Sequence, residues 1–262
     1  MSPAARPTGR LVLVPNSLDL GTAPQPIDEL LPAAALRRAA GLTHWVVESA
    51  KVARAFLKRV DAVVPLVQPL QQMAMQELPR ARKGSGESVA AAAWDSLLAP
   101  ARAGHDVGLL SDAGLPAVAD PGAGVVAAAH RAGVTVEVLC GGSSLTLALA
   151  ASGLNGQRFA FEGYLPQGAA ERDARVRELE QRSRREQQTQ LVIETPYRNE
   201  ALLQALVRQL QPETLLAVAW GLTSPGGGCR SQAVALWRQD LAATDRPAMT
   251  GDLPAVFLWL AT

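Results

Sequence analysis

The sequence predicts an α/β protein of two domains, each built on a sheet flanked by helices. Short β-branched apolar runs alternate with alanine-rich or amphipathic segments of helical spacing. Glycines stand where several of those helices should end. The length of 262 residues is close to the upper limit for a single hydrophobic core. We place the boundary where the sequence changes character after Gly156, so that residues 1–155 form an N-terminal α/β domain and residues 156–262 a C-terminal one.

The first strand is expected over residues 10–15, a β-branched run closed by Pro15. The stretch that follows, up to residue 32, is rich in Asn, Ser, Asp, Gly and Pro and predicts a loop. Apolar spacing then predicts a helix over 33–40, a strand over 44–48 and an amphipathic helix over 50–60. Residues 80–86, which include Arg80, Arg82 and Lys83, predict a loop that is either simply solvated or able to grip a phosphate group.

Helix caps mark the rest of the N-terminal domain. The pattern predicts, in chain order, helix 87–103, strand 105–110, helix 121–132, strand 134–139 and helix 145–152. A glycine follows each of these three helices where its C′ residue belongs: Gly104, Gly133 and Gly153. Asp120 and Pro121 have the residue types of an N-cap and a first helical position.

The C-terminal domain opens on an aromatic stretch and a long charged helix. The pattern predicts an aromatic segment over 159–165, a helix over 167–188, strands over 191–194, 214–220 and 255–260, and a helix over 197–209. Thr195 and Pro196 form a cap and first-turn pair in front of the last of these helices.

Composition excludes several classes of function. Lys and Arg number 25 against 24 Asp and Glu, and a net charge of +1 gives no broad basic surface for a nucleic-acid backbone. Two cysteines and three histidines, without the spacing of zinc ligands, predict a reduced protein with no metal. We find no signal-peptide core and no apolar run long enough to span a bilayer, so we expect a soluble, cytoplasmic protein without a membrane partner.

Three turns share one layout, in which a strand ends, small residues follow and a helix begins: residues 111–120, 140–144 and 194–198. In open α/β sheets, ligands bind outside the carboxyl ends of the strands. Glycine allows the backbone to approach a ligand closely, because it has no Cβ. A single turn of this kind is usually a plain connection, but three in one chain indicate a ligand site.

One alternative is a Rossmann-type oxidoreductase, because residues 122–127 match the G-x-G-x-x-A pattern of dinucleotide-binding folds. That fingerprint should follow a strand directly. Here about ten residues with two prolines separate it from the expected strand that ends at Leu110. A helix face of small residues explains the match better.

Four blocks in order resemble the signature set of the tetrapyrrole (corrin/porphyrin) methylase superfamily. The blocks are Ser111-Asp-Ala-Gly-Leu-Pro-Ala-Val-Ala-Asp-Pro-Gly122, Gly141-Gly-Ser-Ser144 with Ala151-Ser-Gly-Leu154, Phe161-Glu-Gly-Tyr-Leu-Pro166, and Glu194-Thr-Pro-Tyr-Arg198. The most similar branch is that of the small-subunit ribosomal RNA ribose 2′-O-methyltransferases and related probable methyltransferases. The blocks cover residues 107–210 strongly and the flanks weakly.

The resemblance implies a two-domain homodimeric enzyme that binds S-adenosylmethionine between its domains and releases S-adenosylhomocysteine. It also implies a tetrapyrrole-methylase-like fold, with a mostly parallel N-terminal sheet and a mixed C-terminal sheet. The positions that match the donor-binding turns are Ser111, Asp112, Ala113, Gly114, Gly141, Gly142, Ser143 and Ser144. The positions that match as lining the cleft or supporting it are Pro116, Asp120, Glu194, Tyr197 and Arg198.

The chain departs from the family pattern at four places, the last of which is Gly221-Leu-Thr-Ser224 where the ribosomal RNA branch has Glu-Leu-Thr-Lys. After the first strand it has Asn16-Ser-Leu-Asp-Leu-Gly21 where the family has Gly-x-Gly-Pro-Gly-Asp or Thr-Pro-Ile-Gly-Asn-Leu-Gly-Asp. After the second strand, Glu48-Ser-Ala-Lys51 replaces the Glu-Asp-Thr-Arg of the ribosomal RNA branch. Cys140 replaces the proline that opens the family's Pro-Gly-x-Ser turn.

The reaction class sets what the remaining residues must do. Methyl transfer from a sulfonium depends mainly on positioning and on excluding water. A ribose hydroxyl, unlike a tetrapyrrole carbon, also needs a group that takes up its proton or stabilises the alkoxide. Glu48 and Lys51 are the candidates, with an ordinary strand-end carboxylate and a solvated lysine as the alternative reading. The acceptor is thus expected to be ribosomal RNA or a tetrapyrrole, and a chain that binds the donor without transferring it is the other hypothesis.

Overall fold

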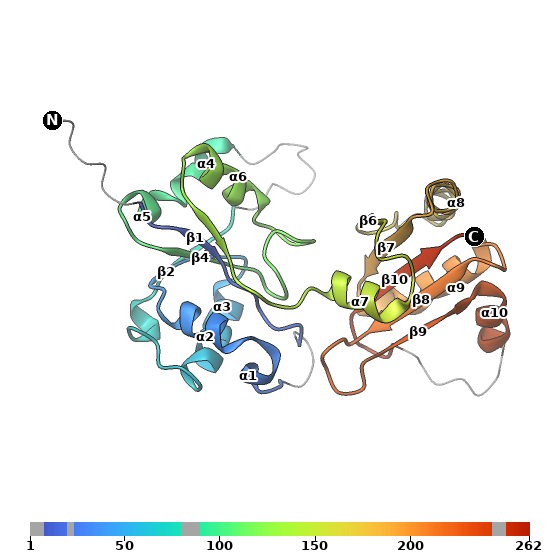
Figure 1. Cartoon of the computed structure of the whole chain (residues 1–262), viewed down its shortest axis with the longest axis horizontal. Helices are drawn as coiled ribbons and strands as arrows, with labels where there is room; N and C mark the ends of the chain where they lie inside the picture. The colour runs from blue at the N-terminus through green and yellow to red at the C-terminus, as the bar shows by residue number, and fades with distance from the viewer. Residues whose placement is uncertain (1–7, 20–23, 80–89, 243–249) are drawn as a thin grey trace. The chain divides into compact units, whose positions relative to one another are not determined.

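The computed structural model describes residues 8–19, 24–79, 90–242 and 250–262 (Figure 1). These residues divide into two compact units, the first ending at Ser143 and the second beginning at Ser144. The basic segment 80–86 lies outside the described residues. None of the helices in the described part of the chain has the length and apolar character needed to cross a membrane.

The first unit contains a fully parallel five-stranded sheet in the order β3-β2-β4-β1-β5. Its strands are β1 (Leu11–Leu13), β2 (His44–Val47), β3 (Ala74–Glu77), β4 (Val107–Leu110) and β5 (Val136–Val138). Its helices are α1 (Ile27–Leu30), α2 (Ala33–Ala40), α3 (Ala50–Asp61), α4 (Ala91–Ser96), α5 (Ala99–Arg102) and α6 (Ala123–Arg131), with the 3₁₀ turn η1 (Leu70–Gln72). Parallel neighbours require crossover connections, which is why helices alternate with the strands.

Helices cover both faces of this sheet. Apolar residues of α1, α2 and α3 form one core with Val12, Trp45 and Val47. Residues of α5 and α6 form a second core with Leu11 and Leu109 on the opposite face. Figure 1 shows α2 and α3 on one side of the sheet and α4 and α6 on the other. A parallel sheet buried on both faces explains why its strands are continuous apolar runs in the sequence.

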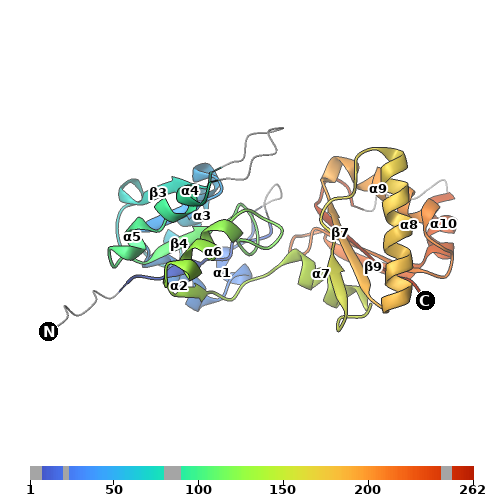
Figure 2. The same cartoon turned by 90° about the horizontal axis from the view of Figure 1, so that it is seen from above.

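The second unit contains a mixed five-stranded sheet in the order β6-β7-β10-β8-β9, in which β6 and β7 are parallel and the other pairs antiparallel. Its strands are β6 (Phe159–Phe161), β7 (Thr189–Glu194), β8 (Leu215–Trp220), β9 (Gly228–Ala233) and β10 (Ala255–Leu260). Its helices are α7 (Ser144–Ser152), α8 (Ala169–Glu186), α9 (Asn199–Gln209) and α10 (Val234–Ala242), with the 3₁₀ turn η2 (Pro196–Arg198). Helices α8, α9 and α10 pack on one face and α7 on the other (Figure 2). The predicted α/β fold, with a parallel N-terminal and a mixed C-terminal sheet, is confirmed.

Helix α7 belongs to the second unit, because it packs on β8, β9 and β10. The division at Ser143 therefore falls before this helix, whereas the sequence analysis divides the chain after it, at residue 155.

Three local expectations are wrong. The stretch up to residue 32, predicted as a loop, contains the short helix α1. Asp120 is not the N-cap of α6, which begins at Ala123 with Gly122 at the N-cap and no capping side chain. The predicted helix 87–103 is, in its described part, two short helices, α4 and α5. Pro100 lies in the first turn of α5, and a proline there cannot donate the hydrogen bond that would continue the preceding helix.

Candidate functional site

The parallel sheet of the first unit brings several predicted site residues to one edge. Asn16 follows β1, Glu48 follows β2, Ser111 follows β4 and Gly141 follows β5. Because the four strands are parallel neighbours in the order β2-β4-β1-β5, their carboxyl ends share one edge of the sheet. This edge is the candidate site.

The turn of residues 111–114 is held by hydrogen bonds from two flanking loops. The backbone N–H of Asp112 donates to Oε2 of Glu48 at 3.1 Å. Nδ2 of Asn16 donates to the carbonyls of Ser111 and Asp112, at 3.1 and 2.9 Å. The backbone N–H of Asn16 donates to the carbonyl of Gly114 at 2.8 Å. Donors and acceptors on both sides thus hold the backbone in one conformation.

Glycines bring the first two predicted turns together. Gly114 has a φ of +66°, and a Cβ on it would lie 3.2 Å from Cδ2 of Leu18 and 3.7 Å from the carbonyl oxygen of Gly142. A Cβ on Gly141 would lie 2.2 Å from Cβ of Pro15, closer than any side chain allows. The two turns predicted to bind one ligand therefore lie against each other, and glycine permits the approach.

The loop between β4 and α6 is strained. Ala117 and Ala119 have φ values of 67° and 62°, a left-handed conformation that costs a non-glycine residue on the order of 1 kcal/mol each. Strain of this kind is typical of functional sites. This loop positions Asp120 near Glu48 and Asp112. Burial raises the pKa of Asp120 to about 6, and the charges of Glu48 and Asp112 act in the same direction.

The edge fits a cationic ligand with polar groups. Oγ of Ser111 is buried and has no hydrogen-bond partner among the described residues, so it is available to hydrogen-bond a ligand. Each turn contains glycine, Gly114 in the first and Gly141 in the second, whose backbone carries no Cβ atom. Three carboxylates close enough to affect one another favour a positive charge nearby. A sulfonium nucleoside such as S-adenosylmethionine has this chemistry.

The other predicted residues of the first unit lie around this edge or beside it. Ala113 is half-buried, Pro116 is buried, and Ser143 is 7% exposed. Glu48 contacts the turn directly, whereas Lys51 is exposed in the first turn of α3. The catalytic roles of Glu48 and Lys51 stay predictions.

The remaining predicted positions belong to the second unit. Ser144 opens α7. Oε1 of Glu194 accepts from the backbone N–H of Thr195 at 2.7 Å and from Nη2 and Nε of Arg198 at 2.7 and 3.0 Å. Tyr197 is 81% exposed, and the guanidinium of Arg198 lies 5.7 Å from its ring centroid. Glu194, Tyr197 and Arg198 thus form one local cluster, and their role at a donor stays a prediction.

An ion pair between α3 and the loop that follows β1 is not predicted from the sequence. Nη2 of Arg59 on α3 lies 2.8 Å from Oδ2 of Asp19, whose side chain is 4% exposed. Burial acts to raise the pKa of Asp19, but hydrogen bonds from Arg59, Ser17 and the backbone of Gln25 outweigh it and hold the pKa below its ordinary value. The sequence signal was an arginine beside the apolar stripe of an amphipathic helix. Its partner lies 40 residues away, so no local pattern reveals it.

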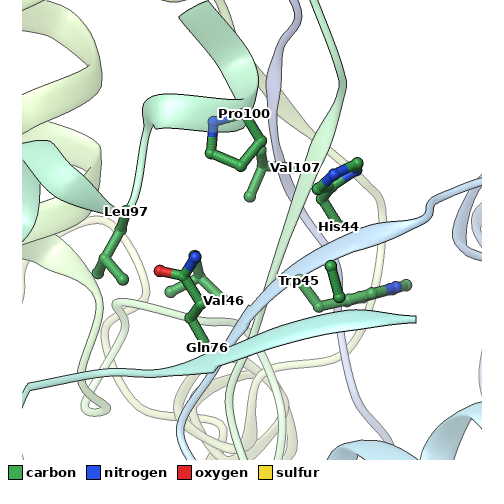
Figure 3. Close-up of a pocket in the computed structure, with 8 residues that line it drawn as sticks. His44, Trp45, Val46, Gln76, Leu97, Pro100 and Val107 are labelled. Carbon is green, nitrogen blue, oxygen red and sulfur yellow. The ribbon is translucent and has the colours of Figure 1, made fainter. Parts of the chain in front are cut away.

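A separate small hollow lies at the opposite edge of the same sheet (Figure 3). It is lined at the amino ends of β2, β3 and β4 by His44, Ala74 and Val107, with Pro100 and Gln76 beside them. The rings of His44 and His105 stack with centroids 4.7 Å apart. This hollow contains none of the predicted site residues. No group of three or more potential metal ligands occurs in the described ranges.

Known proteins share both sequence and fold with this chain. The family model described as Tetrapyrrole (Corrin/Porphyrin) Methylases matches residues 29–227. A protein of Mycobacterium tuberculosis, "Ribosomal RNA small subunit methyltransferase I", is 35% identical over 158 residues, which cover 60% of this chain and 47% of that protein. The protein of the same name in Synechocystis is 39% identical over 127 residues, which cover 48% of this chain and 44% of that protein. The chain thus spans about half the length of these relatives.

Two solved structures show the same fold. The methyltransferase CobJ covers 97% of this chain and 100% of its own, with a TM-score of 0.55 and 16% identity. The cobalt precorrin-4 methyltransferase CbiF covers 99% of this chain and 98% of its own, with a TM-score of 0.54 and 13% identity. The family model matches well over half of the chain, and the predicted resemblance is confirmed: this protein belongs to the Tetrapyrrole (Corrin/Porphyrin) Methylases family.

Proposed function

We propose that this protein binds S-adenosylmethionine at the carboxyl edge of its parallel sheet and transfers the methyl group to a ribose hydroxyl of small-subunit ribosomal RNA. The observation that carries the proposal is the turn at residues 111–114, which Asn16 and Glu48 hold against the glycine turn at Gly142. A backbone that is held in one conformation can present its N–H and C=O groups to the polar atoms of a nucleoside. The names of the relatives support ribosomal RNA as acceptor over a tetrapyrrole.

When bound, the donor supplies an electrophilic methyl group on a positively charged sulfur. The carboxylates of Glu48, Asp112 and Asp120 attract that charge. Because these carboxylates would act on the charged form of the donor, they would contribute to donor affinity rather than to the rate of transfer. The rate then comes from placing the acceptor in line with the methyl group and excluding water.

A ribose hydroxyl must lose its proton as the new bond to oxygen forms. Glu48 lies at the donor turn and is proposed to take up that proton, with Lys51 stabilising the developing alkoxide. Asp120 is a third candidate, because a carboxyl group with a pKa of about 6 is a stronger base than an ordinary carboxylate. We further propose that the protein is a homodimer, as the family resemblance implies, and that it works in the cytoplasm.

The proposal is tested by incubating the protein with S-adenosylmethionine labelled in its methyl group and three acceptors: small ribosomal subunits, deproteinised ribosomal RNA and a tetrapyrrole-containing extract. We expect label in ribosomal RNA, at a ribose oxygen. Label in the tetrapyrrole fraction would move the acceptor to that class. Donor binding without label in any fraction would leave a binding module, and absence of donor binding would end the proposal.

A further inference from the structure

Arg59 of α3 forms several contacts with the loop that follows β1. Nη1 donates to Oγ of Ser17 at 2.9 Å and to Oδ1 of Asp19 at 3.2 Å. Nη2 donates to Oδ2 of Asp19 and to the carbonyl of Gln25, both at 2.8 Å. Oγ of Ser17 also donates to Oδ1 of Asp19. One planar guanidinium therefore contacts both described parts of this loop, at Ser17 and Asp19 and at Gln25.

The Arg59–Asp19 contact differs from an ordinary surface ion pair in its burial and its geometry. The side chain of Asp19 is 4% exposed and that of Arg59 is 27% exposed. A carboxylate buried this deeply needs a charged partner and hydrogen bonds to remain ionised. Two nitrogens of Arg59 contact the two oxygens of Asp19, the forked geometry that arginine provides and lysine does not.

The side-chain amide of Asn16 connects this loop to the donor turn. The backbone N–H of Ser17 donates to Oδ1 of Asn16 at 2.9 Å. That bond fixes which way the amide faces, so Nδ2 points at the carbonyls of Ser111 and Asp112. If the amide turned over, its oxygen would face two carbonyl oxygens, which is repulsive. The Ser17 N–H and the two carbonyls therefore favour the same orientation of the Asn16 amide.

We propose that Arg59 is a positioning residue for the donor site: by fixing Ser17 and Asp19, it orients the Asn16 amide that holds the 111–114 turn in its ligand-ready conformation. The proposal rests on the donor-binding function assigned to that turn. It assigns a role to the loop where this chain departs from the family pattern, at Asn16-Ser-Leu-Asp19. In place of the family's glycine-rich sequence, this chain uses a buried ion pair to order the loop.

The test compares Arg59→Met with Arg54→Met, a matched change at an exposed arginine of the same helix. The first readout is affinity for S-adenosylhomocysteine by calorimetry. We expect Arg59→Met to weaken this affinity at least about tenfold, which corresponds to the loss of one oriented hydrogen bond. Arg54→Met should leave the affinity within about twofold of the wild-type value. Arg59→Lys should recover only part of the affinity, since an ammonium cannot form the fork.

A double variant separates positioning from stability. Arg59→Met leaves the Asp19 carboxylate buried without its partner, whereas Asp19→Asn/Arg59→Met removes that charge as well. The double variant should regain the thermal stability lost in Arg59→Met but not the affinity, because Ser17 and Gln25 still lack their donor. Affinity that returns together with stability would overturn the positioning role.

Hydrogen exchange of the ligand-free protein provides a readout independent of donor binding. In Arg59→Met, the amides of Asn16 and Asp112 should exchange at least about tenfold faster, while amides of the strand β10 keep their wild-type rates. Unchanged exchange at Asn16 would overturn the inference. If the wild-type protein fails to bind S-adenosylhomocysteine, the proposed function falls, and this comparison still decides whether Arg59 orders the turn.

Discussion

Nδ2 of Asn16 donates a hydrogen bond to the carbonyl of Asp112 at 2.9 Å, and the same nitrogen donates to the carbonyl of Ser111. Residues that are 96 positions apart thus form one structural unit at the carboxyl edge of the sheet. This bond is made possible by β1 and β4 being parallel neighbours, which places the residues after both strands at one edge. The ligand-binding turn is therefore held from outside its own sequence.

The first prediction concerns that bond. Asn16→Asp keeps the size of the side chain but faces two carbonyl oxygens with a carboxylate. We expect affinity for S-adenosylhomocysteine to fall at least about tenfold, measured by calorimetry. Gln71→Glu, the same amide-to-acid change at an exposed residue of η1, is the control and should bind as wild type does. Equal affinities in the two variants would show that the Asn16 amide does not support the site.

The second prediction uses two glycines with matching backbone. Gly114 and Gly133 have φ values of 66° and 68°, so replacement by alanine should destabilise either variant by about 1 kcal/mol through the backbone alone. A Cβ on Gly133 would meet nothing within 4 Å, whereas a Cβ on Gly114 would point toward Leu18 and Gly142. Gly114→Ala should lose donor affinity and Gly133→Ala should keep it. Chemical unfolding and calorimetry of both variants measure the two effects, and loss of binding in both would contradict the placement of the site.

The third prediction separates binding from transfer. Glu48→Gln retains an oxygen that can accept from the Asp112 N–H but loses the charge, and Lys51→Ala removes the ammonium. We expect transfer to ribosomal RNA to slow by roughly 100-fold in each, with affinity for S-adenosylhomocysteine changed far less. Lys58→Ala, at another exposed lysine of α3, should transfer at the wild-type rate. A Lys51→Ala variant as active as Lys58→Ala would remove Lys51 from the mechanism.

The fourth prediction concerns pH. The folded pKa of Asp120, about 6, exceeds its ordinary value of 3.8, so folding disfavours the ionised carboxylate. This penalty is absent below about pH 4, where both states are protonated, and complete above about pH 6. Asp120 is only half-buried, so solvent screens part of this effect. The penalty to the free energy of folding is therefore on the order of 1 kcal/mol.

Asp120→Asn should therefore be more stable than wild type at pH 8 and equal to it near pH 4. Thermal unfolding across this range measures the difference. Asp28→Asn, at an exposed residue of α1, controls for the loss of one carboxylate. A stability difference for Asp120→Asn that is the same at both pH values would contradict the raised pKa.

Local signals in the sequence predict the buried strands and the ends of three helices. The expected C′ glycines Gly104, Gly133 and Gly153 all have positive φ, because a left-handed residue ends each helix. Strands β3 and β9 are not predicted. Their residues are largely exposed or half-buried, so they lack the alternating or continuous apolar pattern that marks a strand.

The candidate site can be predicted where its residues are adjacent in the chain. The turns at Ser111 and Gly141 are recognisable because small residues follow an apolar strand directly. The contacts from Asn16, Arg59 and Asp19 are not, since each depends on strand order and on residues far apart in sequence. Asp120 is wrongly predicted as a helix cap because the loop before α6 uses left-handed alanines that no propensity predicts.

The decisive experiment is a calorimetric titration of the purified wild-type protein with S-adenosylhomocysteine, beside the same titration with a nicotinamide dinucleotide. We predict saturable binding of S-adenosylhomocysteine that is lost in Gly114→Ala and kept in Gly133→Ala, with no binding of the dinucleotide. Absence of S-adenosylhomocysteine binding to folded protein, or binding that is indifferent to Gly114→Ala, would show that the carboxyl edge of the parallel sheet is not a donor site.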